Sequence, residues 1–162
     1  MAGMDEPQWL DEREQRAWRS FVIMQAGISE YVERQLRAST GMSMADYQVL
    51  ALLSEAPEGR ARSFVLARWL RWEKGRLSQH LTRMQNRGLT RRERCEDDQR
   101  GAVVVITDEG RALIEKAAPL HMAHVRNVLI DHVTPEQLDL LIELGDQVNA
   151  RLAQIDQEPS SD

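Results

Sequence analysis

The clearest hydrophobic pattern in the chain lies between Lys74 and Asn86. Leu77, Leu81 and Met84 follow one another at steps of four and three residues, so they form one apolar stripe along a helix. At about 100° per residue, small and polar residues fall on the opposite side: Gly75, Gln79, Thr82, Arg83 and Asn86, flanked by Arg76 and Ser78. Gly88 is placed to end the helix. The pattern predicts a helix that packs on one side and leaves the other side free.

Two extended runs follow this helix, the first opening at Leu89 and the second ending in the apolar residues Val103–Ile106. The polar segment from Glu96 to Gly101 separates them, which predicts a β-hairpin. A third, edge strand is expected at Arg60–Arg62, because a two-stranded wing commonly gains one just before the preceding helices. A polar-faced helix followed by a basic hairpin indicates a winged helix.

The residues before this motif predict three more helices. Trp9 to about Arg37 is apolar at steps of three and four, and its length exceeds what one small domain would bury. Ser43 and Asp46 resemble a capping box, which predicts a second helix ending near Glu55. Ser63 is expected to cap a short third helix.

The expected buried side of the short third helix is apolar: Val65, Leu66, Trp69 and Leu70. The polar-faced helix then begins near Glu73, only a few residues later. Two helices separated by three or four residues form a helix-turn-helix.

The residues after the hairpin predict two further helices. Thr107 precedes an acidic first turn and is expected to cap a helix that runs to about His132. Pro119 lies inside it and predicts a kink or local break near Ala118. Thr134 and Pro135 are typical of a helix start, and this last helix should reach about Asp156. Its apolar residues have the spacing of a coiled-coil seam, which needs a partner: Leu138, Leu141, Gly145, Val148, Leu152 and Ile155.

Composition agrees with a mainly α fold with a small β-hairpin wing. The 162 residues are 42% hydrophobic and 29% charged, with only eight aromatic residues, which argues against a large β fold. One cysteine cannot form an internal disulfide, and no apolar run approaches the roughly 20 residues that cross a bilayer. The first residues lack the features of a signal peptide. We therefore expect a cytoplasmic protein without membrane contact.

The net charge of −5 conceals a basic segment. Residues 59–107 contain twelve basic and five acidic residues, a balance of +7, whereas the remainder contains nine basic and 21 acidic residues, a balance of −12. A charge run alone more often marks a solvated surface. Here the charge coincides with a helix-then-hairpin pattern, which favours a module that binds DNA phosphates.

The order of elements resembles the MarR family of transcription regulators, from about Trp9 to Leu152. The most specific motifs are Arg76–Glu93, the triplet Asp98, Gln99 and Arg100, which matches the family's Asp-x-Arg at the wing tip, and Ile106–Glu115. The resemblance implies a homodimer on double-stranded DNA, with the polar-faced helices in successive major grooves and wing arginines in the minor grooves. Residues 1–42 would form an N-terminal dimerisation helix, 43–107 the DNA-binding lobe and 108–162 the C-terminal dimerisation helices, as one intertwined domain.

Eleven residues are the candidates for DNA contact: Ser43, Arg62, Lys74, Gly75, Arg76, Ser78, Gln79, Thr82, Arg83, Asp98 and Arg100. Gln79 can read adenine and Arg76 can reach guanine, whereas Lys74, Ser78, Thr82 and Arg83 suit phosphates. Asp98 would hold the planar guanidinium of Arg100 for entry into a narrow minor groove, although an exposed turn with a weak ion pair is the plain alternative. The dimer would form through Leu138, Leu141, Val148, Leu152 and Ile155.

One residue departs from the family pattern. Between the two helices of the helix-turn-helix the family usually has glycine, which adopts positive φ easily, whereas this chain has Arg71. A strained or altered turn is expected there, or an arginine that points at a phosphate.

The resemblance also implies a small aromatic or phenolic effector, bound between the dimerisation helices and the DNA-binding lobe. Five residues could line such a crevice, although at helical spacing they also suit an ordinary core: Trp18, Phe21, Met24, Tyr47 and Leu50. No cofactor is expected, and no metal.

The favoured hypothesis is a ligand-responsive repressor that binds a palindromic operator as a homodimer. A winged-helix module that binds protein is the alternative, and it would not need a +7 segment. A thiol response through Cys95, or a metal response through His121, His124 and His132, is the other alternative on the same fold. The chain has no recognisable nucleophile with a base, phosphate loop or cofactor motif, so an enzyme is not expected.

Overall fold

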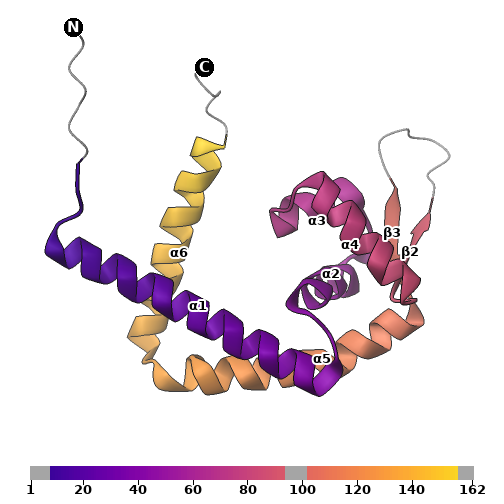
Figure 1. The fold of residues 1–162 in the computed structure, drawn as a ribbon, viewed down its shortest axis with the longest axis horizontal. Helices are drawn as coiled ribbons and strands as arrows, with labels where there is room; N and C mark the ends of the chain where they lie inside the picture. The colour runs from indigo at the N-terminus through magenta and orange to yellow at the C-terminus, as the bar shows by residue number, and fades with distance from the viewer. Residues whose placement is uncertain (1–7, 94–101, 157–162) are drawn as a thin grey trace, which may run out of the picture. The chain divides into compact units, whose positions relative to one another are not determined.

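The computed structural model describes residues 8–93 and 102–156, and the chain divides into two compact units, the first ending at His124 and the second beginning at Val125. The fold is mainly α-helical with a small antiparallel sheet, as the sequence predicts (Figure 1). In chain order the elements are α1 (Glu12–Thr40), α2 (Met44–Glu55), the 3₁₀ turn η1 (Pro57–Gly59), β1 (Arg60–Arg62), α3 (Ser63–Leu70), α4 (Lys74–Asn86), β2 (Thr90–Glu93), β3 (Val103–Ile106), α5 (Asp108–Val128), the 3₁₀ turn η2 (Ile130–His132) and α6 (Pro135–Ile155).

Helix α1 begins and ends about three residues later than the sequence pattern predicts. Asp11 caps it, because the Asp11 carboxylate accepts from the Glu14 amide and the Glu14 carboxylate accepts from the Asp11 amide, both at 2.8 Å. At the other end Gly41 adopts a left-handed conformation, with φ of 70°. The apolar periodicity located the helix correctly, and these two caps set its limits.

Helix α2 lies at the centre of the first unit, between α1 and the pair formed by α3 and α4 (Figure 1). The predicted capping box is confirmed: the Asp46 amide donates to Ser43 Oγ at 3.1 Å, and the Ser43 amide donates to Asp46 Oδ2 at 3.2 Å. Val49, Leu50 and Leu53 are buried along its length. Because α2 contributes to the core on several sides, its position fixes those of its neighbours.

The predicted hairpin and its edge strand form a three-stranded sheet in the order β1-β3-β2. Arg62 pairs with Val103 in one ladder, and Glu93 pairs with Val103 in the other. The central strand β3 is apolar throughout, and Val104, Val105 and Ile106 are buried. It therefore joins the sheet to the helical core.

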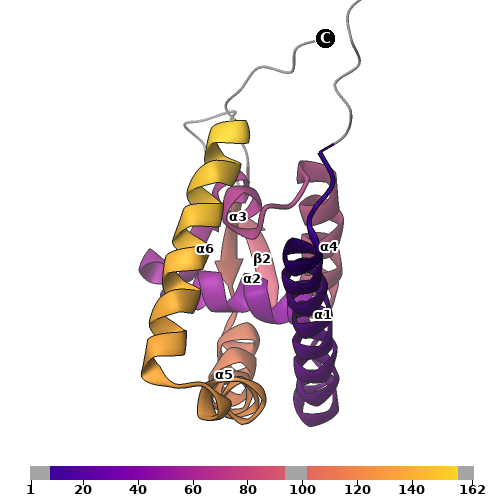
Figure 2. The same ribbon diagram turned by 90° about the vertical axis from the view of Figure 1, so that its left-hand side faces the viewer.

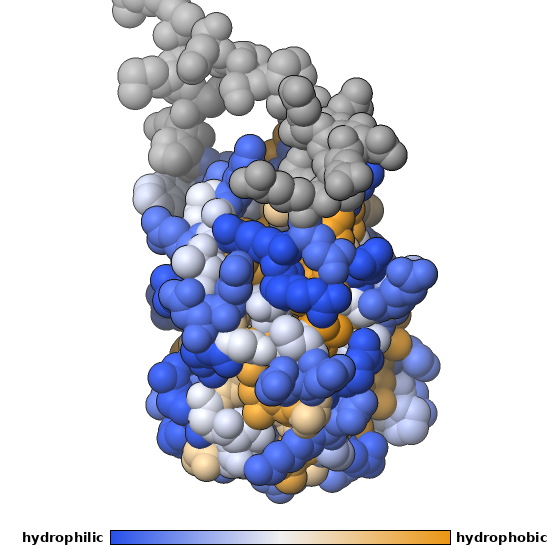
Figure 3. Space-filling view, turned by 90° about the vertical axis from the view of Figure 1, so that its right-hand side faces the viewer, coloured by the Kyte–Doolittle hydropathy of each residue, from blue (hydrophilic) through white to orange (hydrophobic). Residues whose placement is uncertain are grey.

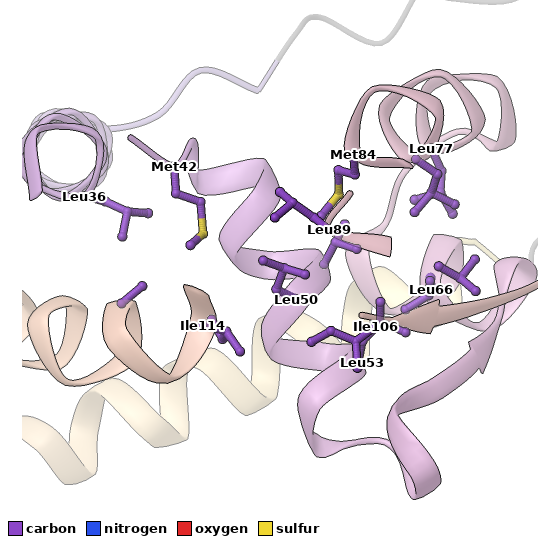
Figure 4. Close-up of a cluster of buried hydrophobic side chains, with 14 residues drawn as sticks. Leu36, Met42, Leu50, Leu53, Leu66, Leu77, Met84, Leu89, Ile106 and Ile114 are labelled. Atoms are coloured by element: carbon purple, nitrogen blue, oxygen red, sulfur yellow. The ribbon is translucent and has the colours of Figure 1, made fainter. Parts of the chain in front are cut away.

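The core gathers leucine, methionine, valine and isoleucine side chains from α1 through α5 (Figure 4). Its largest fully buried side chains include Leu36, Met42, Leu50, Leu66 and Met84. The predicted stripe of α4 is confirmed, since Leu77, Leu81 and Met84 are all buried in this cluster.

The prediction for α3 is wrong in two details. Ser63 does not cap the helix; Arg62 is the N-cap residue, and both the amide and the hydroxyl of Ser63 donate to the Ala102 carbonyl. Trp69 is 69% exposed, although the apolar pattern predicts burial. A helix of eight residues has room for few buried positions, and Leu66 occupies the one that reaches the core.

Arg71 takes the left-handed conformation that glycine favours at this turn, with φ of 52° and ψ of 42°. Of the expected alternatives, the turn is strained rather than altered: Arg71 adopts the backbone geometry of a glycine, at a conformational cost of about 1 kcal/mol for a residue with a Cβ.

The predicted start of α5 is confirmed, and its predicted end is not. The Thr107 hydroxyl accepts from the Gly110 amide at 3.0 Å and donates to the Gly88 carbonyl at 2.6 Å. The helix ends at Val128 rather than near His132, because Leu129 leaves helical conformation and the chain continues as η2. Pro119 lies inside α5 without dividing it, so the alternative of a local break is wrong.

In the second unit, Thr134 and Gln137 form the predicted cap of α6, which Figure 2 shows as a continuous helix. None of the described residues of α6 is buried. Leu141, Val148, Leu152 and Ile155 are exposed, so the predicted seam is available for a partner.

The first turn of α5 packs so closely on the segment before β2 that it tolerates no side chain at Gly110. A Cβ there would collide with the Leu89 carbonyl and lie only 3.0 Å from Ile106 Cγ1. We predict that Gly110→Ala lowers the free energy of unfolding by about 1–3 kcal/mol. Chemical denaturation measures this loss. Gly75→Ala is the control, because a Cβ at Gly75 meets no atom within 4 Å, and it should not lower stability. Equal stability of the two variants would contradict the close approach.

Candidate nucleic-acid interface

Helix α4 presents one polar and basic face to solvent. The residues that the sequence places on this face are all exposed: Lys74, Gly75, Arg76, Ser78, Gln79, Thr82 and Arg83. In the described part of the chain, no ion pair involves Lys74, Arg76 or Arg83. The face of the molecule at the sheet end of the lobe is largely hydrophilic, with apolar residues in narrow patches (Figure 3). The geometry allows the predicted DNA contacts, which remain predictions.

An arginine that sequence reasoning missed ties β2 to this face. Arg92 Nη2 donates to the Ser78 carbonyl at 2.8 Å, and it lies 3.4 Å from both Ser78 Oγ and Thr82 Oγ1. Thr82 Oγ1 also donates to the Ser78 carbonyl at 3.0 Å. The two hydroxyls are therefore held in fixed positions on the face of α4.

Two basic residues of the sheet differ from those of α4, because both share Glu93 as an acidic partner. Glu93 pairs with Arg60 at 2.6 Å and with Arg91 at 2.9 Å. These acidic contacts reduce the net positive charge of the sheet, whereas among the described residues Lys74, Arg76 and Arg83 of α4 have no acidic partner.

A buried carboxylate anchors α4 to α2. Asp46 is only 3% exposed, and Arg87 Nη1, just beyond the end of α4, donates to its Oδ2 at 2.8 Å. The other carboxylate oxygen, Oδ1, lies 3.1 Å from His80 Nε2. The same Asp46 thus caps α2 and holds the middle and the end of α4.

His80 is the second buried polar residue of this network. It is 8% exposed, Arg83 Nη2 lies 3.2 Å from its Nδ1, and the Trp72 ring stands perpendicular to it at 5.4 Å. Arginine can only donate, so Nδ1 accepts and the hydrogen of the neutral ring is on Nε2, facing Asp46. Nε2 makes no other polar contact and no well-aligned hydrogen bond.

The protonation states follow from the surroundings. Burial alone would raise the pKa of Asp46, but hydrogen bonds from Arg87 and Ser43 outweigh it, so the pKa is lowered and the carboxylate is ionised at neutral pH. Burial lowers the pKa of His80, and the positive charges of Arg83 and Arg87 add to this against the opposing effect of Asp46. The pair is therefore a carboxylate beside a neutral imidazole.

The other predicted DNA contacts lie away from α4. Ser43 is half-buried and its hydroxyl caps α2, while Arg62 is half-buried at the N-cap position of α3. Asp98 and Arg100, the predicted minor-groove pair, lie outside the described residues, as does Cys95.

The five predicted effector residues differ in exposure and in their contacts. Trp18 and Phe21 stack at 5.9 Å on α1 and are exposed, as is Met24, whereas Leu50 is fully buried and Tyr47 packs on His121 at 4.3 Å. A pocket of about 320 Å³ lies elsewhere, between α2, η1 and α3. Its lining residues are Leu52, Glu55, Ala56, Pro57, Val65, Leu66 and Trp69.

The two histidines of α5 that were considered as metal ligands each face a tyrosine. His121 contacts the Tyr47 ring, and His124 makes an edge contact with Tyr31 at 6.1 Å. Burial, and to a lesser extent the charge of His124, lowers the pKa of His121. Within the described ranges, no group of three or more histidine, cysteine, aspartate or glutamate side chains is placed to hold a metal ion.

The model of the MarR family matches residues 40–101 of the chain. The crystal structure of AbsC, a MarR family transcriptional regulator from Streptomyces coelicolor, is 37% identical, with a TM-score of 0.87 over 91% of this chain and 99% of AbsC. The chain belongs to the MarR family. Sco3205, another MarR family regulator from Streptomyces coelicolor, was solved in complex with DNA; it is 35% identical, with a TM-score of 0.84 over 96% of this chain and 94% of Sco3205.

A relative from Bacillus subtilis (strain 168), the uncharacterized HTH-type transcriptional regulator YdgJ, is 26% identical over 118 residues, covering 73% of this chain and 70% of YdgJ. The MarR family consists of transcriptional regulators, and the fold of this chain is that of a winged helix-turn-helix regulator. None of the helices in the described ranges is long and apolar enough to span a membrane.

The anchoring role of Asp46 predicts a pH-dependent contribution to stability. Because the folded state lowers the pKa of Asp46, its contribution is complete above the unfolded value of about 4 and is lost as pH falls through the folded value. Asp46→Asn should therefore lower the free energy of unfolding by about 1–3 kcal/mol at neutral pH, and by less as pH falls below 4. Denaturant titrations at several pH values measure the difference.

The control for this prediction is Glu115→Gln, which removes an exposed carboxylate of α5. Its effect should stay within about 0.5 kcal/mol at every pH. A loss in Asp46→Asn that does not shrink in acid would show that the ionised carboxylate is not what stabilises the anchor.

Proposed function

We propose that this protein is a sequence-specific regulator of transcription that binds double-stranded DNA, with α4 as its recognition helix. The main supporting observation is the exposed basic and polar face of α4, whose basic residues have no acidic partner among the described residues. On its other side, α4 is held to α2 by the buried Asp46, which contacts His80 and Arg87. The relation to Sco3205, which was solved with DNA, supports it.

The exposed residues of α4 suit different parts of a duplex. Gln79 can pair with an adenine edge and Arg76 with a guanine edge in the major groove. Lys74, Ser78, Thr82 and Arg83 are proposed to contact phosphates, together with Ser43 and Arg62. Asp98 and Arg100 are proposed as the minor-groove pair, on the strength of the sequence motif alone.

We further propose that the protein acts as a homodimer on a palindromic operator. Most apolar residues of α6 are exposed, and so are several in the first half of α1, including Trp18, Phe21 and Ile23. Exposed apolar surface of this extent favours association. A two-fold dimer would present two recognition helices to successive major grooves, about one helical turn apart.

Repression and a response to a small aromatic or phenolic effector are proposed from family membership. Trp18, Phe21, Met24, Tyr47 and Leu50 remain the proposed effector residues, and no cofactor is required. Since operators lie on genomic DNA, we propose a cytoplasmic site of action.

The dimer proposal predicts that charge in the seam of α6 dissociates the protein. Leu141→Glu combined with Val148→Glu places two carboxylates on one apolar face, so the variant should have the monomer mass at micromolar concentration by light scattering. Ala150→Glu adds a carboxylate on the side of the same helix opposite the seam and should leave the dimer intact. A wild-type protein with monomer mass would overturn the proposal.

The DNA proposal predicts a steep dependence of affinity on salt. Each phosphate contact releases counterions, so several basic contacts from two lobes should weaken binding by at least about a hundredfold between roughly 50 and 200 mM salt. Fluorescence anisotropy with a duplex from the upstream intergenic DNA of the protein's own gene measures the slope. Lys74→Ala should flatten it, whereas Lys116→Ala, on the exposed side of α5, should not.

A flat salt dependence in the wild type would favour the alternative, a winged-helix module that binds protein. Footprinting gives a second readout, because a dimer should protect two half-sites of an imperfect palindrome. Protection of one short half-site would contradict the two-fold arrangement.

A further inference from the structure

A continuous series of contacts leads from the buried Asp46 to the exposed Arg76. The Arg76 guanidinium carbon lies 4.4 Å from the centre of the Trp72 ring. The Trp72 ring stands at 90° to the His80 ring, with 5.4 Å between centroids. His80 in turn lies against Asp46, at 3.1 Å. Trp72 thus supports an exposed arginine on one side and contacts the buried anchor on the other.

The contact between Arg76 and Trp72 suits an arginine that must bind in a defined geometry. A cation over an indole face is attracted to the ring, which restricts a long and otherwise mobile side chain. This contact with the ring uses none of the guanidinium's N–H groups as conventional hydrogen-bond donors, so they remain available for two hydrogen bonds to a base. An arginine that is already ordered loses less conformational entropy on binding.

The Trp72 ring is itself held in place. Trp72 is half-buried between α3 and α4, where its amide donates to the Ala67 carbonyl at 3.0 Å. The His80 ring that it abuts is fixed by Asp46 on one nitrogen and Arg83 on the other. Rotation of the indole would require this buried ring to move as well.

We propose that Trp72 is a specificity-determining positioning residue, which holds the Arg76 guanidinium ready to read a guanine in the major groove without contacting DNA itself. The inference rests on the proposed function of α4. The inference goes further than that function, because discrimination at one base pair would depend on Trp72, which lies behind the exposed face of α4. A merely structural Trp72 would instead affect binding to all sequences alike.

The test is a double-mutant cycle on base preference. The probe is a duplex selected by the wild-type protein from a random library, and competitors carry each single base change in one half-site. Trp72→Leu should reduce discrimination at one G·C pair by roughly three- to tenfold, and should have no further effect in the Arg76→Ala background. Trp72→Phe, which keeps an aromatic face, should restore most of the preference.

Trp69→Leu is the matched control, since Trp69 is exposed on α3 and makes none of these contacts. It should leave the preference at every position unchanged. Circular dichroism establishes that each variant folds, and if Trp72→Leu does not, the same cycle with Trp72→Phe should show a smaller loss that again disappears without Arg76.

Two results would overturn the inference while leaving the proposed function intact. One is a uniform loss of affinity across all competitors in Trp72→Leu, and the other is an equal loss of discrimination with and without Arg76. If the wild-type protein selects no sequence from the library, both the inference and the proposed function are wrong.

Discussion

The buried Asp46 carboxylate is the interaction on which the geometry of the lobe depends. A carboxylate removed from water is costly unless its charge and its acceptor positions are compensated. Here Ser43 at the start of α2, Arg87 beyond the end of α4, and His80 in the middle of α4 all surround it. Burial of this charge therefore goes together with the packing of α4 and its C-terminal end against the start of α2.

Periodicity and capping patterns located nearly every element of the described fold from the sequence. Local signals explain this success: Ser43, Thr107 and Thr134 cap helices through residues only three positions away. The stripe of Leu77, Leu81 and Met84 identified the buried side of α4 for the same reason. Errors occurred where a boundary depended on a cap that was overlooked, as with Asp11 and Glu14.

The missed features depend on residues far apart in the chain. Asp46 and Arg87 are 41 positions apart, and Arg92 reaches Ser78 across 14 positions, so no local pattern predicts either contact. The exposure of Trp69 also depends on the surroundings of its helix in the fold. Hydrophobicity indicates that a side chain prefers burial, but not whether a short helix has room to bury that side chain. Asp98 and Arg100 lie outside the described residues, and their proposed role rests on the motif.

The same contacts constrain how DNA binding could be regulated. Asp46 joins α2 to α4, Arg92 joins α4 to β2, and Thr107 joins the start of α5 to Gly88 beyond α4. The absence of space at Gly110 leaves no room for sliding between α5 and the segment before β2. Because close-packed elements tend to move together, a rotation of α4 alone would have to break these contacts. In the proposed dimer, a regulating ligand would therefore have to displace α4 together with its sheet and the start of α5, so we expect such a ligand to act on the spacing between the two lobes.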